Sequence, residues 1–205
     1  MSDSDLILSK VAVTRFSHDL AGVMSAVSNS LALLSELGGA DAETMALATD
    51  SAESLLARLR FFRAAFGSDG PLTDAAVTRS LFENWLKSVE NRATRFKCDW
   101  DVDGELPLFW FRLILLAGLV AAESLTRGGT ISVVAKAGTK QASVEAVGAA
   151  VKADASVDAV LTGESGNVTP KTAAAAFIRG IMQEQNLTVE AKHSETSFSL
   201  KFKTA

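Results

Sequence analysis

Two long segments of this chain place apolar residues on one face of a helix, and only a few residues separate them. In residues 13–34 and 45–66 the apolar positions recur every three or four residues, which is the spacing of a single helical face. Gly38-Gly39 breaks the pattern, and Asp41 can cap a second helix that begins at Ala42. The sequence therefore predicts an antiparallel helical hairpin. Its apolar positions are Val13, Phe16, Leu20, Val23, Val27, Leu31 and Leu34, then Met45, Ala48, Ala52, Leu55, Leu59, Phe62 and Phe66.

A single hairpin cannot cover two apolar seams of this length. Two hairpins related by a twofold axis can, because they pack into a four-helix bundle that buries the apolar faces of all four helices. We therefore expect a homodimer formed through residues 13–34 and 45–66.

One histidine of the first segment lies beside the apolar seam and not on it. His18 shares its helical stripe with Gly22, Ser25 and Asn29, which follow at the same three-to-four-residue spacing and carry small or polar side chains. A partner could therefore approach the imidazole closely. Asp19 follows His18 directly in the sequence. This pattern predicts a docking surface with a reactive group at its centre.

The composition excludes several classes of protein. A chain of 205 residues with 48% hydrophobic content can build real cores, whereas a net charge of -4 and a pI near 5.3 argue against a nucleic-acid binder. The single cysteine, Cys98, cannot form an intrachain disulfide. The acidic start of the chain is unlike a secretory signal, and the apolar stretch 106–122 is interrupted by Arg112. We expect a cytoplasmic protein without membrane insertion.

The chain changes character after residue 67, where the sequence GSDGP marks a domain boundary. We expect one unit over residues 1–67 and a second over 68–205. In the second unit, helices alternate with strands that can lie in one sheet, which predicts an α+β protein whose C-terminal part is a two-layer α/β sandwich. The expected helices span 74–92, 108–125, 153–161 and 171–185, and the expected strands span 96–102, 130–137, 141–147, 187–192 and 197–203.

The order of these parts resembles the core of a two-component histidine kinase, in which a dimerisation hairpin precedes an ATPase-like domain. More closely, His18-Asp19-Leu20, with Ala26 eight and Asn29 eleven residues after the histidine, resembles the alphaproteobacterial ChpT-type histidine phosphotransferases. The stretch 113–133, which includes Ala121-Ala122-Glu123-Ser124-Leu125 and Arg127-Gly128-Gly129, is similar to the degenerate nucleotide-fold helix and turn of that family.

The resemblance implies a dimeric phosphorelay protein. It would accept a phosphoryl group from the receiver domain of a hybrid histidine kinase and pass it to response regulators, with Mg²⁺ supplied by the receiver. His18 would carry the phosphoryl group, since a largely neutral imidazole can attack phosphorus and later release it. Asp19 would assist, although neighbouring helical residues point about 100° apart. The partner would contact Arg15, Gly22, Ser25 and Asn29.

The chain also departs from the kinase pattern. Val23 replaces the proline that follows the histidine by five residues in kinases, no asparagine occurs from Arg112 to Thr130, and no Gly-x-Gly occurs anywhere. The elements that hold magnesium and close over a nucleotide are therefore missing, and we expect neither ATP nor another cofactor or resident metal. Two alternatives stay open: a dimeric adaptor that binds response regulators without accepting phosphate, and a kinase with an unusual nucleotide site.

Other charged residues permit more than one interpretation. Glu123 and Arg127 could be remnants of a nucleotide site, but we interpret them as charges that stabilise the end of a helix. Arg58, Arg60 and Arg63 could meet an acidic receiver surface or could simply form a solvated helix face.

Overall fold

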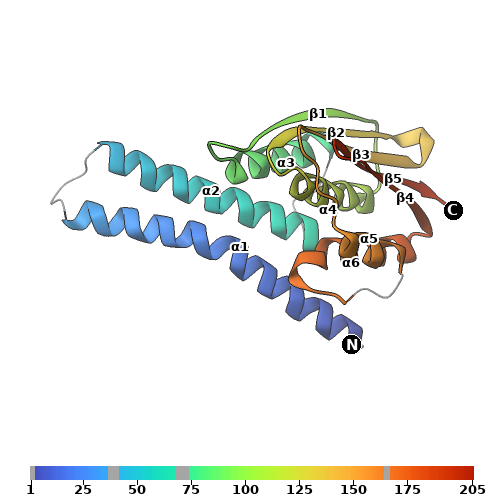
Figure 1. Cartoon of the computed structure of the whole chain (residues 1–205), viewed down its shortest axis with the longest axis horizontal. Helices are drawn as coiled ribbons and strands as arrows, with labels where there is room; N and C mark the ends of the chain where they lie inside the picture. Colours follow the sequence, from blue (N-terminus) through green and yellow to red (C-terminus); the bar gives the residue numbers. More distant parts are fainter. Residues whose placement is uncertain (1–2, 37–41, 68–73, 164–166) are drawn as a thin grey trace.

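The computed structural model describes residues 3–36, 42–67, 74–163 and 167–205. Its first two helices, α1 (Asp3–Glu36) and α2 (Ala42–Phe66), run side by side in opposite directions, and one end of the pair projects away from the rest of the molecule (Figure 1). The predicted helical hairpin is therefore confirmed. The Gly38-Gly39 break and the predicted cap Asp41 lie outside the described residues.

The C-terminal part contains four α-helices and five strands among the described residues, as the sequence predicts. Each agrees with its expected range to within a few residues. The largest difference is at the first of these helices, which ends at Val89 and not at residue 92, and at the last helix Pro170–Thr172 forms a 3₁₀ turn before the α-helix begins. The elements are α3 (Ala75–Val89), β1 (Arg95–Asp103), α4 (Leu108–Ser124), β2 (Gly128–Lys136), β3 (Gln141–Val147), α5 (Ala155–Thr162), α6 (Ala173–Glu184), β4 (Leu187–His193) and β5 (Ser197–Thr204), with short 3₁₀ turns η1 (Ala137–Thr139) and η2 (Pro170–Thr172).

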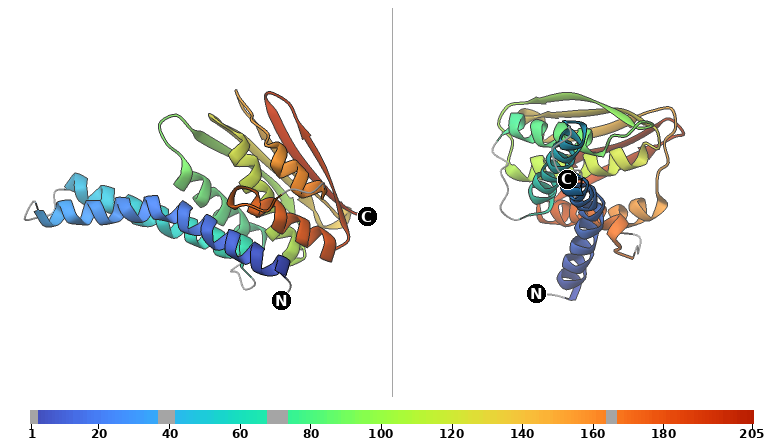
Figure 2. Two further views of the ribbon diagram at one scale, coloured as in Figure 1. Left: turned by 60° about the horizontal axis from the view of Figure 1, so that its bottom comes forward. Right: turned by 90° about the vertical axis from the view of Figure 1, so that its left-hand side faces the viewer.

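The strands form one five-stranded sheet in the order β1-β2-β3-β5-β4. Strands β1 and β2 are parallel and are joined through α4, whereas the other neighbours are antiparallel. The helices lie on one side of the sheet, and the other side faces outward (Figure 2). Residues therefore alternate along β1 between exposed and half-buried positions. This is the two-layer α/β arrangement that the sequence predicts.

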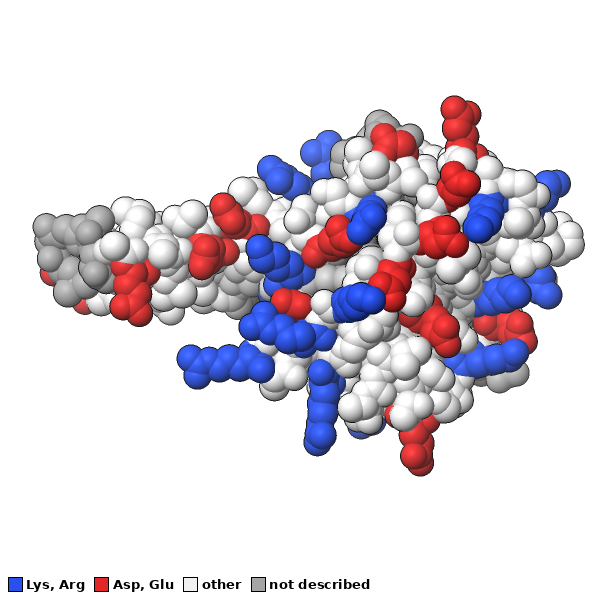
Figure 3. Space-filling view, turned by 90° about the horizontal axis from the view of Figure 1, so that it is seen from above, with Lys and Arg blue, Asp and Glu red and all other residues white. Residues whose placement is uncertain are grey.

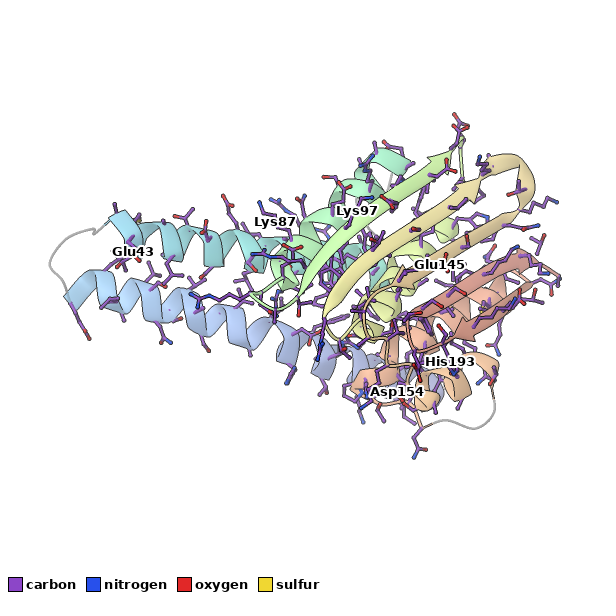
Figure 4. All side chains as sticks on the ribbon, turned by 45° about the horizontal axis from the view of Figure 1, so that its top comes forward. Glu43, Lys87, Lys97, Glu145, Asp154 and His193 are labelled. Carbon is purple, nitrogen blue, oxygen red and sulfur yellow. The ribbon has the colours of Figure 1, made fainter. Side chains whose placement is uncertain are left out.

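The outward face of the sheet carries charges of both signs in alternation (Figure 3). Lys97 on β1 and Glu145 on β3 are examples on this face (Figure 4). Lys97 pairs with Asp99 at 2.7 Å, and Lys136 approaches Asp101 at 3.6 Å. Mixed charge of this kind suits a solvated surface and does not form the continuous basic patch that phosphate backbones need.

Helix α4 is the centre of the hydrophobic core. From Trp110 to Ala122 its side chains are buried except that of Arg112, because the sheet covers one side of the helix and α2, α3 and α6 cover others. Gly118 makes this packing possible, since a Cβ there would lie 2.6 Å from the ring of Phe82 on α3. No helix in the described parts of the chain is both long and apolar enough to cross a membrane.

A series of aromatic contacts connects the hairpin to the sheet. Phe16 on α1 stacks on Phe62 of α2 at 5.2 Å, and Phe61 meets Phe62 edge-on at 5.7 Å. Phe61 also stacks on Trp85 of α3, and Phe82 on the same helix lies 6.4 Å from Trp100 of β1. The base of the hairpin is therefore part of the same apolar core as the sheet domain.

The two predicted apolar seams have different surroundings along their length. Near the base of the hairpin, Phe62 is buried, and Phe16 packs against the core. In the projecting part, large apolar side chains are exposed in the single chain, and they include seam residues at which we expect the dimer contact. The exposed apolar residues of the hairpin are Ile7, Val13, Met24, Leu31, Leu33, Met45, Leu47, Leu56 and Leu59.

Candidate functional site

Helix α1 presents His18 to the solvent, with 89% of its side chain exposed. Gly22, Ser25 and Asn29 are exposed on the same helix, so the structure places the predicted stripe of small and polar residues at the surface. A Cβ at Gly22 would meet nothing within 4 Å, and the Ser25 hydroxyl is used locally, donating to the carbonyl of Ala21 at 2.9 Å. The imidazole is therefore reachable along an unobstructed helix face.

Asp19 connects the imidazole to the interior of the protein. Its Oδ1 lies 3.4 Å from Nδ1 of His18, and its Oδ2 accepts a hydrogen bond of 3.1 Å from Nε of Arg15. Adjacent helical residues point in different directions, but the length of the Asp side chain allows one oxygen to reach the ring. The carboxylate is thus shared between a buried guanidinium and an exposed imidazole.

Arg15 occupies a different environment from the one that we predicted. We expected it to bind a partner, but only 7% of the residue is exposed, because α1 packs against α6 and η2 at this point. Its Nη1 donates to the carbonyl of Pro170 at 3.2 Å, and its Nη2 donates to the Glu123 carboxylate. Arg15 therefore bonds within the chain and offers almost no surface to a partner.

The charges around Arg15 compensate one another. Burial lowers the pKa of the Arg15 guanidinium, but Glu123 and Asp19 outweigh that effect, so its pKa lies above the ordinary value and it stays charged. Burial also raises the pKa of the Glu123 carboxyl, and this increase is opposed by Arg15. Glu123, which we interpreted as a charge at the end of a helix, lies near the end of α4 and forms an ion pair with Arg15. The i, i+4 spacing of Arg15 and Asp19 could have indicated their own pairing.

Arg58 on α2 forms hydrogen bonds to the backbone beside Asp19 and at the end of α3. Its Nη1 donates to the backbone carbonyl of Asp19 at 3.1 Å, and its Nη2 donates to the carbonyl of Ser88 at 2.7 Å, at the end of α3. Burial lowers the pKa of Arg58, and the negative charge of Asp19 opposes this. Arg58 therefore holds three helices together, whereas Arg60 and Arg63 are exposed. The sequence did not reveal this role because both partners of Arg58 are backbone atoms.

An open groove of about 430 Å³ runs between α1 and α2 beside the His18 stripe. It begins one turn beyond the histidine and has Arg58 at its inner end. Its lining is small or polar at most positions, and it consists of Gly22, Val23, Ala26, Asp50, Ser51, Ser54 and Arg58.

A second hollow, of about 280 Å³, lies beside the end of α4. Two of its charged residues, Asp154 and Lys171, pair with each other. Asp154 accepts hydrogen bonds from the Ser156 amide and hydroxyl at the start of α5, and it forms an ion pair with Lys171. Within the described residues, no group of three or more His, Cys, Asp and Glu side chains could hold a metal ion.

Comparison with known proteins agrees with this architecture. The sequence model of one protein family, described as the histidine phosphotransferase C-terminal domain, matches residues 79–197. The chain belongs to the histidine phosphotransferase family. The match covers the sheet domain, so His18 lies outside it.

The ChpT-type resemblance is confirmed by a curated relative. Protein phosphotransferase ChpT of Brucella abortus (strain 2308) is 32% identical over 134 residues, which are 63% of this chain and 61% of that protein. The match therefore spans less than two thirds of the relative's length.

The overall fold also matches that of a solved structure. A structure described as a bacterial phosphotransferase superposes with a TM-score of 0.81 at 21% identity and covers 99% of this chain and 98% of its own. The Acinetobacter baumannii histidine kinase AdeS has a TM-score of 0.48 at 11% identity, over 92% of this chain and 97% of its own.

Proposed function

We propose that this protein is a phosphorelay component that accepts a phosphoryl group on His18 from one receiver domain and passes it to another, without using ATP. The observation that carries the proposal is the environment of His18. Its imidazole is almost fully exposed, and one of its nitrogens faces a carboxylate that a buried arginine holds in place. Membership of the histidine phosphotransferase family supports this chemistry.

The transfer requires little from this chain beyond a reachable nucleophile. A nitrogen of His18 attacks the phosphorus of the receiver's aspartyl phosphate, the phosphorus–oxygen bond breaks, and the aspartate leaves as a carboxylate. The reverse reaction with a second receiver releases the phosphoryl group. Because the transition state is loose, positioning and charge placement supply most of the catalysis, and the receiver's own Mg²⁺ neutralises part of that charge.

The receiver would dock along the stripe formed by Gly22, Ser25 and Asn29 and into the groove between α1 and α2. Gly22 leaves open space one turn beyond His18, so the partner's aspartyl phosphate can come close. We expect the partners to be the receiver of a hybrid histidine kinase and those of response regulators, and we expect the protein to act in the cytoplasm. The net charge of -4 does not favour nucleic acid.

A second copy of this chain would cover the exposed apolar side chains of the hairpin. Leu31 and Leu59 are 56% and 49% exposed in the single chain, and several other large apolar residues surround them on the same two helices. Exposed apolar surface of this extent marks an interface, and pairing two hairpins about a twofold axis would bury it. The proposed active form is therefore a homodimer built around a four-helix bundle.

The test is phosphoryl transfer from a purified, radiolabelled receiver domain. Wild-type protein should gain a label that is lost in acid and retained in alkali, as expected for phosphohistidine, and His18→Gln should gain none. His193→Gln is the matched control, because the chain contains only two histidines and His193 lies on β4 in the sheet domain (Figure 4). Its labelling should equal that of wild type.

Two other results would contradict the proposal. Receiver binding without labelling would identify the protein as the silent adaptor. Labelling from ATP alone would identify it as a kinase.

A further inference from the structure

The ion pair between Arg15 and Glu123 joins the sheet domain to the helix that carries His18. Glu123 lies near the end of α4, and its carboxylate accepts from Nη2 of Arg15. The Nε of the same guanidinium donates to Asp19, whose other oxygen faces His18. A continuous set of contacts therefore runs from the core helix of one unit to the imidazole on the other.

We propose that Glu123 is a positioning residue for phosphoryl transfer at His18, acting through Arg15 and Asp19. The inference rests on the proposed function, because it concerns the reactivity of the same imidazole. It adds a role for the sheet domain, in which a residue of α4 sets the geometry of the phosphate-accepting residue on α1.

The geometry of the guanidinium explains why Glu123 is needed. The planar fork of an arginine can grip a single carboxylate through two parallel hydrogen bonds. Such a grip on Asp19 would occupy both oxygens and draw Oδ1 away from the ring. Glu123 and the Pro170 carbonyl engage Nη2 and Nη1 instead, so Arg15 offers only Nε to Asp19. Oδ1 is thereby left 3.4 Å from Nδ1 of His18.

This arrangement favours one form of the imidazole. If the ring carries its hydrogen on Nδ1, that hydrogen is donated to Asp19, and the lone pair lies on Nε2, the nitrogen farther from the carboxylate. When Nε2 bonds to phosphorus, the ring gains positive charge while its Nδ1 hydrogen still points at Asp19. The carboxylate then stabilises that charge, as an aspartate does for a catalytic histidine in other enzymes.

A small donor tests the chemistry separately from receiver docking. With phosphoramidate, Nε2 attacks phosphorus, the phosphorus–nitrogen bond breaks, and the nitrogen leaves as ammonia after taking a proton from water. Glu123→Gln keeps the size of the side chain but removes its charge, and we expect labelling of His18 to slow about ten-fold, the effect typical of a residue that orients a reactive group through an intermediate. Thermal unfolding of each variant will show that it is folded.

Glu83→Gln is the matched control. Glu83 pairs with Arg79 on α3 and, like Glu123, has 40% of its side chain exposed, but this pair does not touch the His18 set of contacts. Its rate with phosphoramidate should equal that of wild type.

A double variant distinguishes positioning from a general structural effect. If Glu123 acts through Asp19, then Glu123→Gln combined with Asp19→Asn will be labelled no more slowly than Asp19→Asn alone. The Asp19 carboxylate, which the proposed effect of Glu123 requires, is already absent from both variants. The inference would be overturned if the double variant lost labelling rate by the product of the two single reductions, or if Glu123→Gln were labelled at the wild-type rate.

A second measurement does not depend on transfer. Nitrogen NMR of the imidazole should show the neutral His18 ring with hydrogen on Nδ1 in wild type, and a shift toward hydrogen on Nε2 in Glu123→Gln. An unchanged ring would contradict the inference. If wild type takes up no label at His18 although the ring shifts as expected, the proposed function fails while the positioning contact stands, so the two failures are distinguishable.

Discussion

Phe61 on α2 stacks on Trp85 of α3, with the ring centroids 4.5 Å apart and the planes inclined by 17°. Both side chains are buried, and together they join the hairpin to the sheet domain. Trp85→Ala should lower the free energy of unfolding by about 3–5 kcal/mol, since it empties a site that cannot collapse around α4. Urea denaturation will measure this. Lys87→Ala, an exposed change on the same helix, should have an effect within about 0.5 kcal/mol, and equal effects would contradict the stacking argument.

Gly128 is required by the parallel pairing of β1 and β2. Its φ is +74°, and a Cβ there would lie 2.0 Å from the carbonyl oxygen of Arg95, its partner in the strand register. Gly128→Ala should therefore cost about 1–3 kcal/mol of unfolding free energy through backbone strain, with the clash adding to it. Gly138→Ala, where nothing lies within 4 Å, is the control and should be nearly neutral by the same denaturation measurement.

Charge on the exposed apolar part of the hairpin should separate the proposed dimer. Leu59→Glu adds a carboxylate to a side chain that is 49% exposed in the single chain, so the fold should survive and only self-association should weaken. Sedimentation equilibrium at micromolar concentration measures this. Leu108→Glu changes a similarly exposed residue at the start of α4, outside the hairpin, and should leave association unchanged. A monomeric wild-type protein would refute the bundle.

We chose Leu59 and not Leu20 for this test because the two leucines have different surroundings. Leu20 is half-buried and packs against the core, so a charge there would destabilise the chain itself. A loss of association at that position would not isolate the interface.

Acid should weaken the start of α5. Hydrogen bonds and the ion pair with Lys171, together with the Ser156 contacts, lower the pKa of Asp154 from 3.8 to about 2. A carboxyl group whose pKa is lower in the folded state stabilises the fold above its unfolded pKa, and this contribution disappears as the pH falls through the folded value. Most of it should therefore be lost between about pH 4 and pH 2.

The measurement compares Asp154→Asn with wild type at several pH values. At pH 6 the variant should be less stable by about 1 kcal/mol, a value reduced for the partial exposure of the pair. Below pH 2 the difference should vanish. Asp103→Asn, an exposed change at the end of β1, is the control for loss of a surface carboxylate.

Sequence periodicity was sufficient for the architecture because it reports which face of each element is apolar. The helix–strand order, the buried nature of α4 and the exposure of His18 all follow from local patterns. Periodicity does not show which distant segment covers a given face. The seam residues Phe16 and Leu31 look equivalent in the sequence, yet one packs on the core and the other is exposed.

The same limit explains why the burial of Arg15 was not predicted. A basic residue three positions before an exposed histidine is a natural candidate for partner contact. Its burial depends on Glu123, which is 108 positions away, and on the Pro170 carbonyl, which is 155 positions away. No local pattern could have shown that these groups meet one arginine. Arg58 was ambiguous for a related reason, since its two partners are backbone carbonyls that every residue possesses.

The shared core at the base of α2 limits how this protein can be recombined with its relatives. The predicted border after residue 67 suggests a place to exchange sheet domains between phosphotransferases, but Phe61, Phe62, Ala64 and Ala65 are buried with α3 and α4 on the far side of that border. In a chimera joined there, the aromatic side chains at the end of α2 from one parent would pack against α3 and α4 from the other. A working exchange therefore has to carry the last two turns of α2 along with the sheet domain, even though they belong to the hairpin by sequence.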